Sequence, residues 1–188
     1  KWLGFFAPIL LAACAGGPPP PDWQLNSVSA ANAFQRNYLQ GETRAADLEF
    51  SRLKSEISAT GRADLLARAE LLRCAARAAS LEFDACPGFE ALRADAGGEE
   101  ITYAENLAGR AERAPSDEPL AKLVAAAIRL KTTRISPQEI AVAVEIASAQ
   151  GWRRPLLAWL GVQEKRAQAA GDREAAERIK RRIDLILR

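Results

Sequence analysis

The sequence predicts an all-α fold, on three observations. Of its 188 residues, 39 are Ala and 22 are Leu, and both types favour helices. Aromatic residues make up only 6%, and the apolar residues recur with the helical period of about 3.6 rather than the strand period of 2. Hydrophobic residues (48%) and charged residues (27%) together exclude a disordered chain and a polytopic membrane protein. We therefore expect one domain of about seven or eight helices in antiparallel hairpins.

The N-terminal segment has the pattern of an export signal. Lys1 precedes an apolar run from Trp2 to Leu11, which is about half the roughly 20 residues that a membrane-spanning helix needs. Small residues follow the run, as they do at signal cleavage sites. No Met occurs in the chain, so we expect the natural signal to begin before Lys1.

The end of this signal, Leu11-Ala12-Ala13-Cys14, resembles the lipobox of bacterial lipoproteins. The resemblance implies cleavage between Ala13 and Cys14, a diacylglycerol thioether on the Cys14 sulfur and an acyl chain such as palmitate on its new amino group. Two or more acyl chains form a stable anchor. Ala15 stands where an Asp would imply inner-membrane retention, so we expect the outer membrane, with the protein facing the periplasm. The alternatives are an ordinary signal peptide or a short buried helix that includes Cys14.

A proline-rich tether follows the anchor. Pro18 to Pro21 predict polyproline II, a semi-rigid spacer. We therefore divide the chain into a signal peptide at residues 1–13, a lipidated Cys with its tether at 14–26, and a periplasmic helical domain at 27–188.

The helices of this domain show apolar stripes and end signals. Residues 136–139, Ser-Pro-Gln-Glu, form a capping box with Pro at the first helical position. Gly171 ends one helix and Asp172 caps the next. Three predicted stripes are Ala46, Phe50, Leu53 and Ile57; then, after a break at Thr60-Gly61, Leu65, Ala69, Leu72 and Ala76; and at the end Ala175, Ala176, Ile179, Ile183 and Ile186.

Two of the hairpins are similar to tetratricopeptide repeats, in which a turn Gly is followed by a small Ala and then by an aromatic residue at fixed spacing. The first copy is Gly41, Ala46, Phe50 and Leu53, and the second is Gly171, Ala176 and Ile183, with Lys180 in the aromatic position. The resemblance implies a degenerate superhelix. The two glycines lie 130 positions apart, which is not a multiple of 34, so a plain helical bundle is the alternative.

Cys74 and Cys86 remain once Cys14 is assigned to lipid, and an exported protein is in a compartment where disulfides persist. A helix that continued to Phe83 would carry the chain too far for the cysteines to meet. A Cys74–Cys86 bridge therefore requires the helix to end near Ala79 or Ser80. Two buried thiols are the alternative.

A second cluster suggests a partner contact. Trp152, Arg153, Arg154 and Trp159 lie at the start of one predicted helix, and Trp and Arg dominate the energetic centres of interfaces. The alternative interpretation is that Trp159 belongs to the core and Trp152 covers the turn below it.

Catalytic chemistry is not expected. The chain has no His, which removes the commonest general base and metal ligand. The acid pairs Glu99-Glu100 and Asp117-Glu118 are explained by their positions at predicted helix starts, where they offset the helix dipole. No phosphate-binding loop or metal motif occurs, so we expect no enzyme activity, no metal and no cofactor.

The sequence therefore predicts a lipid-anchored binding or scaffold module of the cell envelope. We expect an envelope protein as partner and no nucleic acid. One alternative is an accessory factor directed at peptidoglycan. Another is a structural lipoprotein whose last helix lies on the membrane surface through its basic side chains, Arg178, Lys180, Arg181 and Arg182.

Overall fold

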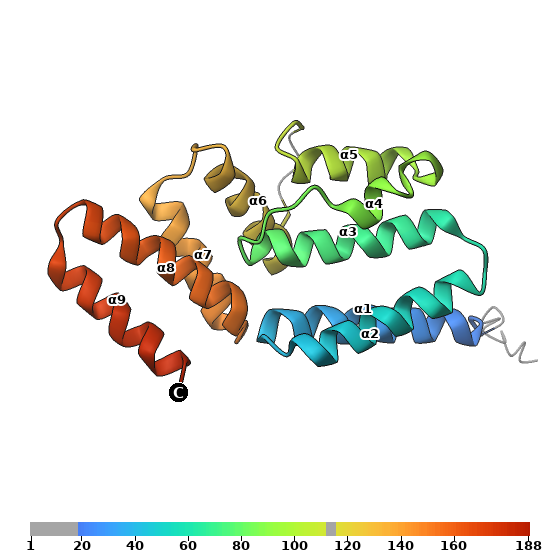
Figure 1. The fold of residues 1–188 in the computed structure, drawn as a ribbon, viewed down its shortest axis with the longest axis horizontal. Helices are drawn as coiled ribbons and strands as arrows, with labels where there is room; N and C mark the ends of the chain where they lie inside the picture. The colour runs from blue at the N-terminus through green and yellow to red at the C-terminus, as the bar shows by residue number, and fades with distance from the viewer. Residues whose placement is uncertain (1–18, 112–115) are drawn as a thin grey trace, which may run out of the picture.

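The computed structural model describes residues 19–111 and 116–188, and within them the fold is all-helical, as predicted (Figure 1). The lipobox, residues 11–14, lies outside the described residues. The described segments contain nine α-helices and one 3₁₀ helix, η1, and no strand. The bounds are α1 Asp22–Gln40, α2 Thr43–Ser58, α3 Ala63–Ala79, α4 Pro87–Glu90, η1 Arg93–Asp95, α5 Gly98–Leu107, α6 Pro119–Lys131, α7 Pro137–Ala149, α8 Arg153–Ala169 and α9 Arg173–Ile186.

The domain begins earlier than predicted. Residues 22–26, which we assigned to the tether, form the first turns of α1. Pro21 precedes the helix in an extended conformation (φ −62°, ψ 150°), and Asp22 adds a favourable negative charge to the first turn. The Asn26 side-chain amide donates a hydrogen bond to the Glu56 carboxylate of α2 at 3.2 Å. Residues 22–26 therefore belong to the helical domain and not to the tether.

Helix α3 lies at the centre of the molecule, between the α1–α2 hairpin and the α4–α5 segment (Figure 1). It also contacts α6 and η1. We predicted a single buried stripe for this helix, but its buried residues lie on several faces: Ala67, Ala69, Glu70, Leu71, Cys74, Ala75, Ala76, Ala78 and Ala79. A helix that neighbours cover on several sides is buried all round. Its alanines are small enough to let those neighbours approach closely.

Four helix–helix turns share one backbone geometry. Each contains a glycine in the left-handed region, with φ between 65° and 91°. The residue after each glycine has φ between −81° and −83° and is the N-cap of the next helix. Side chains other than glycine rarely adopt positive φ, which explains the residue type at these turns. The four glycines are Gly41, Gly61, Gly151 and Gly171.

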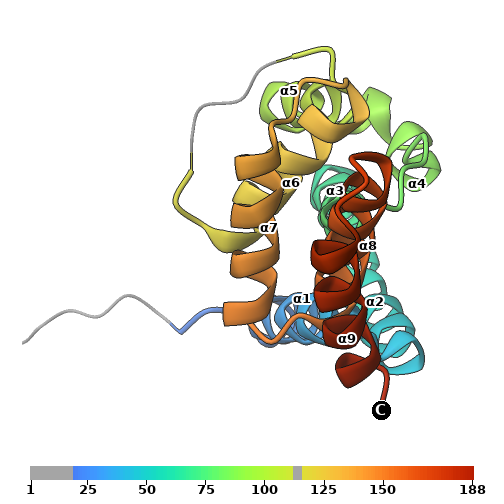
Figure 2. The same cartoon turned by 90° about the vertical axis from the view of Figure 1, so that its left-hand side faces the viewer.

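The predicted stripe of α2 is confirmed, since Ala46, Phe50, Leu53 and Ile57 are all buried. Phe50 packs on Phe34 of α1 with ring centroids 5.0 Å apart. The predicted stripe of α9 also packs on the rest of the domain: Ala176 is buried, and Ile179, Ile183 and Ile186 are partly buried against the core. Figure 2 shows α9 beside α8 at one end of the helical array.

The predicted disulfide joins Cys74 of α3 to Cys86, with Cα atoms 5.8 Å apart. Helix α3 ends at Ala79, as this bridge requires. The bridge holds α4 against α3, where Phe89 is fully buried with Ala67 and Leu71 in a small second core.

We expect the bridge to contribute roughly 3 kcal/mol to the free energy of unfolding, because it closes a short loop in the unfolded chain. The double variant Cys74→Ala/Cys86→Ala should lose that stability, measured by urea unfolding. The native protein with reductant should match the variant, and reductant should not affect the variant. Native stability that is insensitive to full reduction would contradict this assignment.

Candidate functional site

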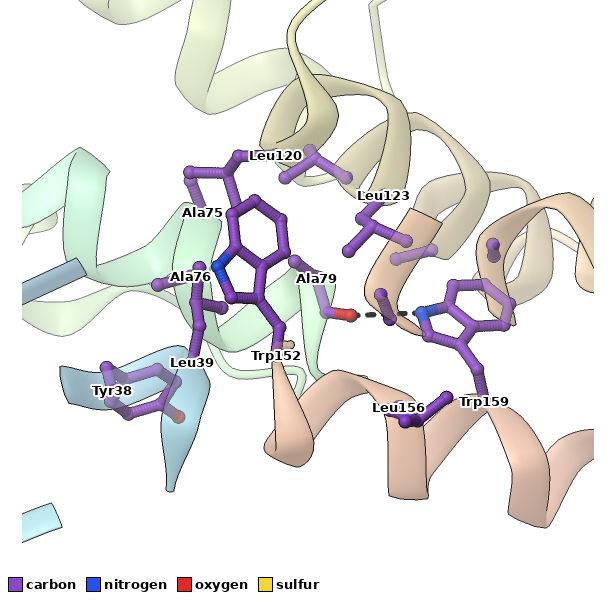
Figure 3. Packing of buried hydrophobic residues seen from close by; sticks show 14 of the residues in the cluster. Tyr38, Leu39, Ala75, Ala76, Ala79, Leu120, Leu123, Trp152, Leu156 and Trp159 are labelled. Atoms are coloured by element: carbon purple, nitrogen blue, oxygen red, sulfur yellow. Dashed lines mark hydrogen bonds between the residues drawn. The ribbon is translucent and has the colours of Figure 1, made fainter. Parts of the chain in front are cut away.

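The two tryptophans predicted to contact a partner lie inside the domain instead. Trp159 is fully buried, and its indole N–H donates a hydrogen bond to the Ala79 carbonyl at the end of α3, at 3.1 Å (Figure 3). Trp152 is 9% exposed, and its ring faces Ala75 and Ala76 of α3. Both side chains therefore pack within the core. The alternative interpretation placed Trp159 there, whereas it had Trp152 covering the turn below instead of packing on α3.

Arg154 also makes intramolecular contacts. Its guanidinium donates to the Tyr38 carbonyl at 2.8 Å and the Thr43 hydroxyl at 2.7 Å, and it pairs with Glu82 at 3.3 Å. It lies 4.4 Å from the centre of the Tyr38 ring. Burial, together with the nearby Glu82 carboxylate, raises the pKa of the Tyr38 phenol. Of the four predicted contact residues, Arg153 is the most open to solvent, and it faces Glu42 at 3.5 Å.

The Trp159 hydrogen bond can be tested by substitution. Trp159→Phe retains an aromatic ring but leaves the buried Ala79 carbonyl without its donor, so we expect a loss of about 1–3 kcal/mol in the free energy of unfolding. Trp159→Ala should lose about 3–5 kcal/mol. Trp23→Phe, at a partly exposed position on α1, is the matched control and should change stability by less than about 0.5 kcal/mol. Urea unfolding measures all three, and equal effects of the two Phe variants would contradict the buried hydrogen bond.

The strongest candidate for a binding site is a groove between α5, α6 and α7, with a cavity of about 380 Å³. We call it the α6–α7 groove. Its surface is mainly apolar, and Val142 of α7 is 42% exposed within it. Its lining residues are Tyr103, Asn106, Ser116, Ala121, Lys122, Val124, Ala125, Ala126, Arg129, Gln138, Glu139, Val142, Ala143 and Ile146. None of these residues was predicted from the sequence to bind a partner.

One end of the groove is built by the predicted capping box of α7. The Glu139 backbone N–H donates to the Ser136 hydroxyl at 3.2 Å, and the Ser136 N–H donates to the Glu139 carboxylate at 2.8 Å. Glu139 also forms an ion pair with Arg129 of α6. Hydrogen bonds from the Ser136 backbone and hydroxyl, and the Arg129 guanidinium, lower the pKa of Glu139 to about 2. A carboxylate at the groove rim therefore caps α7 and links it to α6.

A second hollow, of about 370 Å³, adjoins the first. The two share Tyr103, Ser116 and Ala121 in their linings. The second hollow reaches α3, where Arg68 donates to the buried Glu100 carboxylate at 2.8 Å. That hydrogen bond lowers the pKa of Glu100. Together the hollows extend from α7 across α6 to α3.

The acid pairs lie where the sequence predicted. Glu99 and Glu100 are in the first turn of α5, and Glu118 precedes α6. Glu70, 2% exposed, is a buried carboxylate that the sequence analysis did not single out. It pairs with Lys54 at 3.2 Å and Arg73 at 2.8 Å, and it lies so close to Gly88 that a Cβ there would be 2.2 Å from its oxygen. Glu70 therefore pairs with side chains of α2 and α3 and lies directly against the backbone of α4.

Within residues 19–111 and 116–188, no cluster of three or more His, Cys, Asp or Glu side chains is placed to hold a metal ion. Among the helices of these segments, none combines the length and apolar composition needed to cross a membrane. The chain matches no family model, no curated protein and no solved structure.

The depressed Glu139 pKa predicts a pH-dependent contribution to stability. A carboxylate whose pKa is lower in the folded state stabilises the fold above its unfolded pKa, about 4.3, and loses that effect as the pH falls through about 2. Glu139→Gln should therefore lower the free energy of unfolding at pH 7 but have little effect at pH 2. Glu145→Gln, on the exposed face of α7, should leave stability unchanged at pH 7. Urea unfolding at both pH values makes the comparison, and a Glu139→Gln effect equal at both would exclude the ion pair and cap as its cause.

Proposed function

We propose that this protein is a non-catalytic binding or scaffold module of the bacterial cell envelope, anchored by lipid at Cys14, and that the α6–α7 groove is its binding face. The observation that carries the proposal is the exposed apolar surface of this groove. Val142 and Ala125 face solvent there. Transfer of such a concave apolar surface from water to a partner is favourable.

The lipobox pattern supports the anchored form. If Cys14 carries the lipid, residues 14–21 connect it to α1, which begins at Asp22. Eight residues extend to at most about 28 Å, so the domain would stay close to the membrane surface. An anchored module of this kind would present its groove to other envelope proteins at high local concentration.

The two alternatives have weaker support. A membrane-surface role for α9 needs a free apolar face, but Ile179, Ile183 and Ile186 already pack against the rest of the domain. Helix α9 also lies at the opposite end of the molecule from the start of α1 (Figure 1). A peptidoglycan-binding role needs polar groups for glycan hydroxyls, whereas the groove is mainly lined by apolar atoms.

The proposal is tested by photo-crosslinking in cells that produce the full-length protein. A photo-reactive amino acid replaces Val142 in the groove or, as the control, Val28 on the exposed face of α1, where it is 57% exposed. We expect a defined set of envelope proteins to be crosslinked from position 142 and not from position 28. Cys14→Ala should abolish labelling by radioactive palmitate and also remove these crosslinks.

Two outcomes would overturn the proposal. Equal crosslinking from positions 142 and 28 would show that the groove is not a preferred binding face. Recovery of peptidoglycan fragments alone would favour the cell-wall alternative.

Val142→Glu should also prevent co-purification of the partner while changing the free energy of unfolding by less than about 0.5 kcal/mol, because the side chain is exposed.

A further inference from the structure

We propose that the α6–α7 groove binds a single amphipathic α-helix of another envelope protein, with small or medium apolar side chains on its bound face and carboxylates on the flank nearest α6. This inference rests on the proposed function, because it names the chemistry of the partner at the same groove. Four features of the described residues support it: the backbone hydrogen bonding of the groove helices, the size of the lining side chains, the charges at the rim, and the packing of the α9 apolar stripe against its own domain.

The backbone of the groove cannot pair with an extended peptide. The groove is formed mainly by helices, in which the backbone N–H and C=O groups bond within the helix. The described segments contain no strand, and so no sheet edge that could accept another strand. The buried Asn106 amide donates one hydrogen bond within the chain, to the Ala111 carbonyl at 2.9 Å. An extended peptide on this apolar surface would leave its own polar groups unpaired, whereas a helix satisfies them internally.

The side chains of the groove suit a helix at close range. Ala121 and Ala125 are one helical turn apart on α6 and leave a shallow channel beside it. Val142 and Ile146 are one turn apart on α7 and form the facing ridge. Such a combination of ridge and channel is the surface into which a further helix packs. The adjoining hollow extends this surface toward α3, so the occupant can continue past α6.

The rim charges orient the occupant. Lys122 and Arg129 line the α6 side of the groove, two helical turns apart. Lys122 has one ion-pair partner, Asp117 at 3.1 Å, whose side chain is fully exposed. Such an exposed pair contributes little stability, so Lys122 can exchange it for a carboxylate of the occupant. The α7 side carries Gln138 and Glu139 instead, and Glu139 already pairs with Arg129. Lys122 is therefore the charge that favours acidic groups of the occupant near α6.

A second copy of this chain does not fit as the source of the helix. Among the described helices, α9 combines an apolar stripe with charged flanks most clearly, but Ala176 is buried and Ile179 and Ile183 already pack on the domain. Its flanks are also rich in basic residues, including Arg178 and Lys180, which would meet Lys122 unfavourably. The structure therefore favours a helix from a different protein.

The helical form of the occupant is tested by mapping crosslinks at residue level. Photo-reactive amino acids at positions 125, 138 and 142 of the full-length protein are activated in cells, and mass spectrometry identifies the partner residues that react. We expect these residues to recur at intervals of three or four, which is the spacing along one face of a helix. Intervals of two, typical of an extended chain, would overturn the inference, as would crosslinks to a second copy of this protein.

The charge preference is tested with Lys122→Glu and a matched control, Arg44→Glu, which reverses a charge at an exposed position of α2 outside the groove. We expect crosslinking from position 142 to fall at least fivefold with Lys122→Glu and to be unchanged with Arg44→Glu. Thermal unfolding of both variants verifies that they fold. Equal yields from the two variants would overturn the predicted acidic flank.

These results separate the inference from the proposed function. Specific crosslinking from position 142 with extended-chain intervals would retain a binding module and reject a helical occupant. Crosslinking from position 142 that does not exceed that from position 28 would reject the binding face itself, and with it any occupant.

Discussion

The structure depends on the packing of the start of α8 against α3. Within eight residues, Trp152, Arg154 and Trp159 contact helices that lie far away in the sequence. The Trp159 indole bonds to the Ala79 carbonyl, a group at the end of α3 that has no partner within its own helix. Arg154 bonds to the Tyr38 carbonyl near the end of α1, which also accepts a hydrogen bond from the Gly41 N–H. One segment therefore contacts the C-terminal ends of two helices and links α8 to α1 and α3.

This packing explains how an apolar groove persists at the surface. Helix α6 packs on α3, and α7 packs on α8, so both groove helices are supported on the side away from the groove. The Arg129–Glu139 ion pair then holds α6 and α7 together at the rim. Since this support comes from helices outside the groove, α6 and α7 are held in place although no helix of the described segments covers the open face of the groove. A groove that is formed in advance loses less conformational freedom on binding.

The sequence predicted the features that are determined locally. The turn glycines, the Ser136 cap and the stripe of α2 depend on residues within one or two helical turns, and all agree with the structure. The condition for the disulfide was also local, because the end of α3 decides whether Cys74 and Cys86 can meet, and the helix ends at Ala79 as the bridge requires. The start of α1 was placed too late, since residues 22–26 show no clear apolar stripe from which a helix could be recognised.

The groove and the inward orientation of the tryptophans could not be predicted, because both depend on which helix covers which face. Trp occurs both in buried cores and at the centres of interfaces, so residue type alone could not show that Trp152 and Trp159 belong to the core. Val142 is the opposite case. Its apolar side chain suggests burial, yet no helix of the described segments covers it. The two cases meet at α8, which contains Trp159 and also packs on α7. The packing of whole helices against one another, which local sequence does not specify, therefore decides which apolar side chains are buried.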